Sequence, residues 1–118
     1  MKVINANEGQ KINYSVVAET WLNIGDRLML NLEMMEADNP VHEDIMSDNF
    51  GRLRTGEGDY YVAQIDIPAR TYIESEVQNP DYSPETEGIS PTTLKRDPVP
   101  FSMDNVTLTL FALKEGVF

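Results

Sequence analysis

Residues 58–68 carry the clearest structural signal in this chain, with the sequence Gly-Asp-Tyr-Tyr-Val-Ala-Gln-Ile-Asp-Ile-Pro. Successive side chains of a β-strand point to opposite faces of the sheet, so alternating apolar residues predict a strand with one buried face. Gln64 and Asp66 would point outward, and Pro68 would end the strand because proline has no N–H for the ladder. The buried face of this central strand would carry Tyr61, Ala63, Ile65 and Ile67.

Further strands are predicted on both sides of this segment. Apolar residues alternate over residues 28–34, after a turn signal at 23–26, and again over 106–113. Shorter strand signals occupy residues 2–5 and 71–77. Together these strands predict a shared core that contains Leu30, Leu32, Ala63, Ile65, Leu108 and Leu110.

Residues 11–24 fit two kinds of secondary structure. Tyr14, Val16 and Ala18 alternate as in a strand, whereas Val17, Trp21 and Ile24 fall near one side of a helix. The aromatic and β-branched side chains of the segment favour the strand.

Residues 39–51 predict a short helix. Asn39 is a favourable N-cap, Pro40 is a favourable first helical residue, and Gly51 would end the helix. Acidic residues in the first turn would lie near the positive end of the helix dipole. The buried side of this connector would carry Val41, Ile45 and Phe50.

Residues 78–100 contain five of the seven prolines and few apolar side chains. This composition predicts a long, acidic, Pro-rich loop or arm. The length of 118 residues fits one domain, residues 1–118, with a core of its own. We therefore predict a mainly β fold, a single β-sandwich or open barrel of about six strands with one short helix.

The charge of the chain constrains its partners. A formal net charge of −11, from 20 acidic and 9 basic residues, disfavours nucleic acid, which is bound through lysine and arginine. Residues 33–48 and 74–87 contain no lysine or arginine. Such acidic runs are usually solvated faces, and the alternatives are a basic partner surface or a cation site.

Targeting signals and cysteines are absent from the sequence. Without cysteine there is no disulfide and no thiolate ligand. No run approaches the roughly 18 apolar residues of a membrane span, and the first residues have no apolar secretion signal. We expect a chain that is cytoplasmic at synthesis and has no membrane partner.

The single histidine and the carboxylates complete no known catalytic or metal-binding motif. His42 has no second histidine to complete a zinc motif, and no nucleophile elbow is present. The acidic residues 38–48 do not have the spacing of a calcium loop. Acid–base pairs could be drawn from Glu57, Asp59 and Asp66, but a carboxylate on an outward strand face is usually solvated. We predict no catalytic residue, no metal ligand and no cofactor.

Two short segments resemble immunoglobulin-like β-sandwich modules. Residues 24–32, with the sequence Ile-Gly-Asp-Arg-Leu-Met-Leu-Asn-Leu, are similar to their turn-then-strand pattern Gly-Asp-x-Leu-x-Leu. Residues 58–63 are similar to the Gly/Asp-Tyr start of a late strand in that family. The resemblance implies a sandwich, a tyrosine that braces a corner through its hydroxyl, and a binding or structural role. The chain departs from that family in having no cysteine pair.

These observations favour a non-enzymatic structural or protein-interaction module that presents a sheet edge or residues 78–100 to a protein partner or to copies of itself. A virion or prophage assembly component suits this composition. The alternative is a small-ligand or cation-dependent carboxylate site, in a binding protein or a hydrolase. Lys95 and Arg96 would reach the acidic residues 33–48 of a neighbouring copy. The candidate partner contacts are Tyr72, Tyr82, Ile89, Leu94, Lys95 and Arg96.

Overall fold

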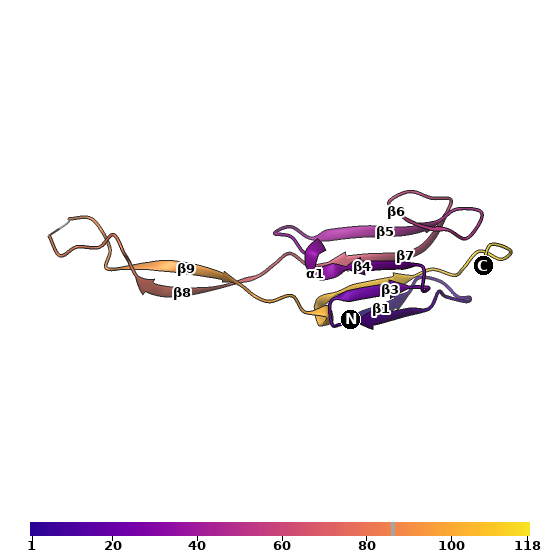
Figure 1. Cartoon of the computed structure of the whole chain (residues 1–118), viewed down its shortest axis with the longest axis horizontal. Helices are drawn as coiled ribbons and strands as arrows, with labels where there is room; N and C mark the ends of the chain where they lie inside the picture. The colour runs from indigo at the N-terminus through magenta and orange to yellow at the C-terminus, as the bar shows by residue number, and fades with distance from the viewer. Residues whose placement is uncertain (86) are drawn as a thin grey trace. The chain divides into compact units, whose positions relative to one another are not determined.

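The computed structural model describes residues 1–85 and 87–118. The fold is mainly β, as predicted, with 44% strand and 6% helix. The chain forms two compact units: unit 1 is Met1–Arg70 with Phe101–Phe118, and unit 2 is Thr71–Pro100. The described strands form sheets of five, three and two strands, and the sheets are not closed (Figure 1).

A five-stranded sheet forms one part of unit 1. Its strands, in spatial order, are β1 (Lys2–Asn5), β10 (Thr107–Leu110), β7 (Tyr60–Ile67), β5 (Val41–Ser47) and β6 (Leu53–Thr55). Strand β1 pairs with β10 in parallel, and the other pairs are antiparallel. The prediction of a central strand at residues 58–68 is confirmed, because β7 has a paired strand on each side.

A three-stranded sheet forms the other part of unit 1. Strands β2 (Tyr14–Val17), β3 (Trp21–Ile24) and β4 (Leu28–Asn31) are joined by short turns. Gly25 and Asp26 have φ angles of 60° and 54°, a left-handed conformation that suits glycine and aspartate, so the predicted turn is confirmed. The strand interpretation of residues 11–24 is also confirmed, although the segment holds two strands. The helix α1 (Leu32–Met35) ends the strand that was predicted to continue to Met34.

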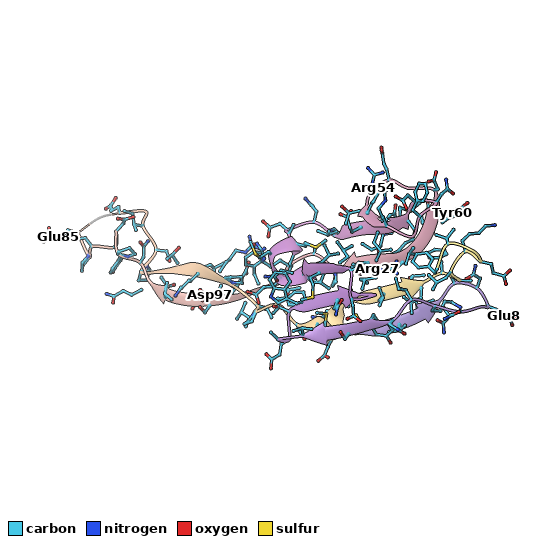
Figure 2. All side chains as sticks on the ribbon, turned by 45° about the vertical axis from the view of Figure 1, so that its right-hand side comes forward. Glu8, Arg27, Arg54, Tyr60, Glu85 and Asp97 are labelled. Carbon is cyan, nitrogen blue, oxygen red and sulfur yellow. The ribbon has the colours of Figure 1, made fainter. Side chains whose placement is uncertain are left out.

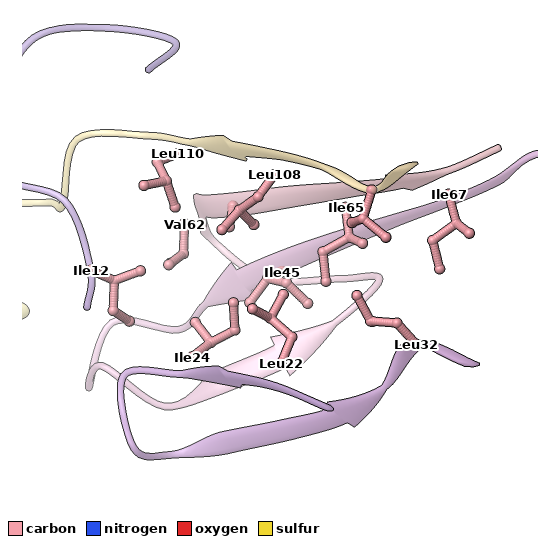
Figure 3. Packing of buried hydrophobic residues seen from close by; sticks show 12 residues of the cluster. Ile12, Leu22, Ile24, Leu32, Ile45, Val62, Ile65, Ile67, Leu108 and Leu110 are labelled. Carbon is pink, nitrogen blue, oxygen red and sulfur yellow. The ribbon is translucent and has the colours of Figure 1, made fainter. Parts of the chain in front are cut away.

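Side chains from both sheets of unit 1 meet in one hydrophobic cluster. Figure 3 shows Leu22 and Ile24 from β3 pointing toward Ile45 from β5. The predicted core is confirmed for its six members, of which Leu30 is only partly buried. The fully or nearly fully buried members of the cluster are Ile12, Leu22, Ile24, Leu32, Ile45, Val62, Ala63, Ile65, Ile67, Val106, Leu108 and Leu110.

The inward face of β7 differs from the prediction at one position. Ala63, Ile65 and Ile67 are buried as expected, but the Tyr61 side chain is 49% exposed. The register between β5 and β7 shifts so that Ile45 pairs with Ala63 while Met46 pairs with Tyr61, leaving Val62 as an extra residue. A β-bulge of this kind breaks the alternation. Val62 therefore takes the buried place and Tyr61 faces outward.

The helix predicted over residues 39–51 is wrong, because Val41–Ser47 is the strand β5. This strand has β7 along one side and β6 along part of the other, so its backbone groups are paired across the sheet. Capping and dipole signals are each worth about 1 kcal/mol, and burial in a sheet overrides them. Ile45 is buried as predicted, whereas Phe50 is 80% exposed after the strand has ended.

Unit 2 is a two-stranded antiparallel ribbon. It consists of β8 (Tyr72–Gln78), β9 (Thr92–Pro98) and the connection between them. The prediction that residues 78–100 form a loop is therefore wrong for β9. Pro91 and Pro98 lie at the limits of that strand, where the missing N–H does not interrupt the ladder, so the proline count misled the prediction.

The number of strands also exceeds the prediction of about six. Two strands come from residues 11–24, and three further strands, β5, β6 and β9, were not expected. A short 3₁₀ helix, Met103–Asn105, precedes β10.

Candidate functional site

The β8–β9 ribbon is the candidate interaction site. Its hydrogen-bond ladder determines which backbone N–H and C=O groups remain free to pair with another strand. In antiparallel strands, opposed residues alternate between pairs that exchange backbone hydrogen bonds and pairs that do not. The N–H of Asn79 donates to the Pro91 carbonyl at 3.0 Å, and the N–H of Val99 donates to the Thr71 carbonyl at 2.8 Å. The odd-numbered residues of β8 therefore direct their backbone groups toward β9. The residues whose backbone groups point away from β9 include Glu74, Glu76 and Gln78.

Both faces of the ribbon are open to solvent. Figure 2 shows side chains projecting from both sides of the strands, with Asp97 on β9 and Glu85 near the turn labelled. Ile73 on one face is 61% exposed, and Leu94 on the opposite face is 62% exposed. Every residue of β9 is exposed. In unit 2 the described residues contribute no side chain to the hydrophobic cluster.

The predicted partner contacts all lie in unit 2. Four of them belong to the strands: Tyr72 on β8, and Leu94, Lys95 and Arg96 on β9. The other two, Tyr82 and Ile89, lie in the connection between the strands, where Tyr82 is exposed and Ile89 is half-buried. The ribbon therefore brings Tyr72 next to Arg96, whereas no contact between Tyr82 and the strands is described.

The two cations of the ribbon have partners within it. Arg96 Nε lies 3.6 Å from Glu74 Oε1, and its guanidinium lies 4.4 Å from the centre of the Tyr72 ring. Lys95 Nζ lies 3.7 Å from Asp97 Oδ1. These local pairs make a contact of Lys95 and Arg96 with another copy a weaker hypothesis.

The acidic residues 33–48, to which that hypothesis assigned the other side of the contact, also have partners within unit 1. Arg70 Nε lies 3.4 Å from Glu36 Oε1, and Arg52 Nε lies 2.6 Å from Asp48 Oδ2. The backbone N–H of Arg52, followed by that of Phe50, holds the pKa of Asp48 below its ordinary value. This segment is therefore not a free anionic surface along its whole length.

Sequence reasoning missed the surface residues of β8. Ile73, Glu74, Glu76 and Val77 belong to β8, whose outer edge pairs with no further strand among the described residues. Their alternation predicted a strand, but an alternating pattern does not tell whether a strand edge is paired. That information comes from the topology alone.

His42 is the centre of a second polar cluster, on the outward face of β5 and β7. Its Nδ1 lies 2.6 Å from Asp66 Oδ1, and its Nε2 lies 2.8 Å from Asp44 Oδ1. The hydrogen bonds to Asp66 and then to Asp44 raise the pKa of His42 above its ordinary value of 6.5. A carboxylate at each ring nitrogen stabilises the doubly protonated imidazolium, which has no lone pair to act as a general base.

The open grooves on unit 1 include two that border residues discussed above. One, of about 260 Å³, borders His42 and Asp66 and is otherwise lined by Pro40, Ile67, Asn105 and Thr107, among others. The other, of about 510 Å³, contains the ring pair of Tyr61 and Phe111, whose centroids are 5.3 Å apart. In the described part of the chain, no group of three or more histidine, aspartate or glutamate side chains is placed to hold a metal ion.

Comparison with family models, with curated protein sequences and with solved structures found no match. The resemblance to immunoglobulin-like modules therefore stays a prediction. None of the helices among the described residues has the length and apolar character that would let it cross a membrane.

Proposed function

We propose that this protein is a non-enzymatic interaction module, in which unit 1 is an open β-sandwich and the β8–β9 ribbon is the surface that contacts a protein partner. The observation that carries the proposal is the ribbon itself. It has two strands of seven residues each, and neither of its faces contributes to a hydrophobic core among the described residues.

The energetics of a bare ribbon support this proposal. An isolated two-stranded hairpin is marginally stable in water, and a third strand or a covering surface is needed for independent stability. Exposed Ile73 and Leu94 would lose their contact with water on binding, at a gain of about 25 cal/mol per Å² of apolar surface buried. Binding of a partner would therefore also stabilise the ribbon.

The alternative of an enzyme with a carboxylate site has weaker support. Its best group is the His42 cluster, and both ring nitrogens there are engaged by carboxylates.

We also propose a virion or prophage assembly as the setting, on the basis of the acidic, cysteine-free β composition alone.

Affinity capture with ribbon variants tests the proposal. The double variant Ile73→Asp/Leu94→Asp should lose the proteins that the wild-type chain captures, because it places two charges on the proposed contact surface. The matched control is Met34→Asp/Phe50→Asp, which changes side chains of unit 1 that are 82% and 80% exposed. The control should capture as wild type does. Equal capture by the ribbon variant and the wild type would contradict the proposal.

A further inference from the structure

The two outer edges of the ribbon differ in their backbone donors. At the edge of β8, the N–H groups of Glu74, Glu76 and Gln78 point away from β9. At the edge of β9, the N–H of Thr92 is 3.4 Å from Ser90 Oγ, and Pro98 has no N–H. The edge of β8 is therefore the better template for a further strand.

The side chains of the two edges differ in the same sense. Native proteins place lysine, other charged residues and proline on a free strand edge, where they prevent it from pairing with another strand. Strand β9 contains Lys95, Arg96, Asp97 and Pro98, whereas β8 has no lysine, arginine, glycine or proline. The charged residues of β8 are Glu74 and Glu76, so its edge disfavours pairing with an acidic strand but not with a basic one.

We infer that the free edge of β8 is a docking site for a basic, extended segment of a protein partner, which adds to the ribbon as a third strand. The inference rests on the proposed function and specifies the chemistry of its partner. Strand addition of this kind takes its affinity from main-chain hydrogen bonds and its specificity from alternate side chains.

The side chains of β8 specify the pattern of that segment. Glu74 and Glu76 lie on one face of the strand, and Ile73 and Val77 lie on the other. Opposed residues of neighbouring strands have Cβ atoms roughly 4.5–5.5 Å apart, so their side chains interact directly. The matching segment reads apolar, basic, any residue, basic, apolar, and this pattern is the same in both chain directions.

Charge favours a basic segment over a second copy of this chain. Among the described residues Glu76 forms no ion pair, and Glu74 forms one, with Arg96. A two-fold pairing of β8 with β8 of another copy, centred on Ser75, would place Glu74 opposite Glu76 of the other copy. Like charges directly opposite each other destabilise a sheet.

A labelled peptide tests this inference. The probe is a capped peptide with the sequence Gly-Ser-Val-Lys-Thr-Lys-Val-Ser-Gly, titrated with the full chain and followed by fluorescence anisotropy. We expect saturable binding that weakens as salt is added, because exposed charge pairs are screened. The control peptide has glutamate in place of both lysines and should not bind.

Two proline variants locate the site. The N–H of Glu76 on β8 and that of Thr92 on β9 both point away from the opposite strand, so a proline at either position leaves the hydrogen bonds between β8 and β9 in place. Glu76→Pro should weaken peptide binding about fivefold to tenfold or more, since an edge hydrogen bond and a charge are lost. Thr92→Pro, on β9 and outside the proposed contacts, should leave binding unchanged. Glu76→Gln keeps the backbone N–H but removes the charge. It should therefore mainly reduce the salt dependence of peptide binding.

The possible outcomes separate the inference from the proposed function. Equal binding to the wild type and Glu76→Pro, or equal loss in both proline variants, would exclude the β8 edge as the site. Equal binding of the acidic peptide would overturn the charge argument, and absence of peptide binding would overturn the whole inference. Self-association that Glu76→Pro alone abolishes would identify a second copy as the occupant. That result would leave the interaction function standing, because the function fails only if Ile73→Asp/Leu94→Asp retains capture.

Discussion

Strands β7 and β8 have similar lengths and similar alternation of apolar and polar residues, yet they occupy opposite environments. Strand β7 has a neighbour on each side and buries Ala63, Ile65 and Ile67. Strand β8 has one neighbour among the described strands, and its second residue, Ile73, is 61% exposed. Alternation therefore indicates strand formation, whereas burial depends on which other segments of the chain lie beside the strand.

The largest test of this comparison is truncation of one isoleucine in each strand. Ile65→Ala should lower the free energy of unfolding of unit 1 by about 2–5 kcal/mol, because a fully buried side chain leaves a cavity. Ile73→Ala should change it by less than about 0.5 kcal/mol, as is usual for exposed positions. Urea unfolding followed through the single tryptophan, Trp21 of unit 1, measures both. A near-neutral Ile65→Ala would contradict the assigned core.

Two glycines extend the comparison with a smaller effect. A Cβ at Gly58 would lie 2.5 Å from Met46 Cβ and 3.1 Å from the Ser47 carbonyl oxygen. Gly58→Ala should therefore destabilise unit 1 by about 1–3 kcal/mol through overpacking. Gly88 in unit 2 has no described atom, apart from its chain neighbours, within 4 Å of an added Cβ. Its φ of 84° would strain an alanine, but that strain falls in unit 2 and not in unit 1, which Trp21 reports. Gly88→Ala should leave the unfolding midpoint of Trp21 fluorescence unchanged, and a shift equal to that of Gly58→Ala would refute this reasoning.

The pH dependence of unit 1 should reveal the His42 cluster. The pKa of His42 is higher in the folded state than its ordinary value of 6.5, so the folded state binds the proton more tightly. The resulting stabilisation is fully present below pH 6.5 and is lost as the pH rises through the folded pKa. Because the cluster is exposed, we expect less than about 1 kcal/mol. Urea unfolding of the wild type and of His42→Gln, from below pH 6.5 to above the folded pKa of His42, measures this contribution. If the free energies of unfolding of the two proteins change in parallel with pH, the prediction is wrong.

The smallest expected effect is that of divalent cations. Calcium, magnesium or manganese should leave the melting temperature unchanged, because the described carboxylates form no group suited to a metal ion. Any ligand that binds only the folded state raises the melting temperature, so a thermal-shift scan is a sensitive assay. A specific rise of several degrees with one cation would favour the alternative of a cation-dependent carboxylate site.

The candidate site could be predicted only in part. Tyr72 was named from the sequence because aromatic residues are frequent at interfaces. Leu94 was named as part of a strand-like segment, and Lys95 and Arg96 as the basic pair expected to reach the acidic residues of a neighbouring copy. The residues Ile73, Glu74 and Glu76 were missed, because their importance depends on the unpaired edge of β8. A free edge is a property of the sheet and has no local sequence pattern.

Local sequence patterns were sufficient to predict the strands whose signals agree with one another. Leu108 and Leu110 alternate with threonines and are buried, and the Gly25-Asp26 turn joins β3 to β4. These features need only the two-residue period of a strand and the φ angles of a turn. Only the tertiary structure decided that residues 41–47 are a strand, that Val62 replaces Tyr61 in the core, and that residues 92–98 pair with β8. The first two outcomes depend on hydrogen bonds and burial, and the third on hydrogen bonds to β8. The segments that supply them are about 20 residues away, and together they outweigh local preferences of about 1 kcal/mol.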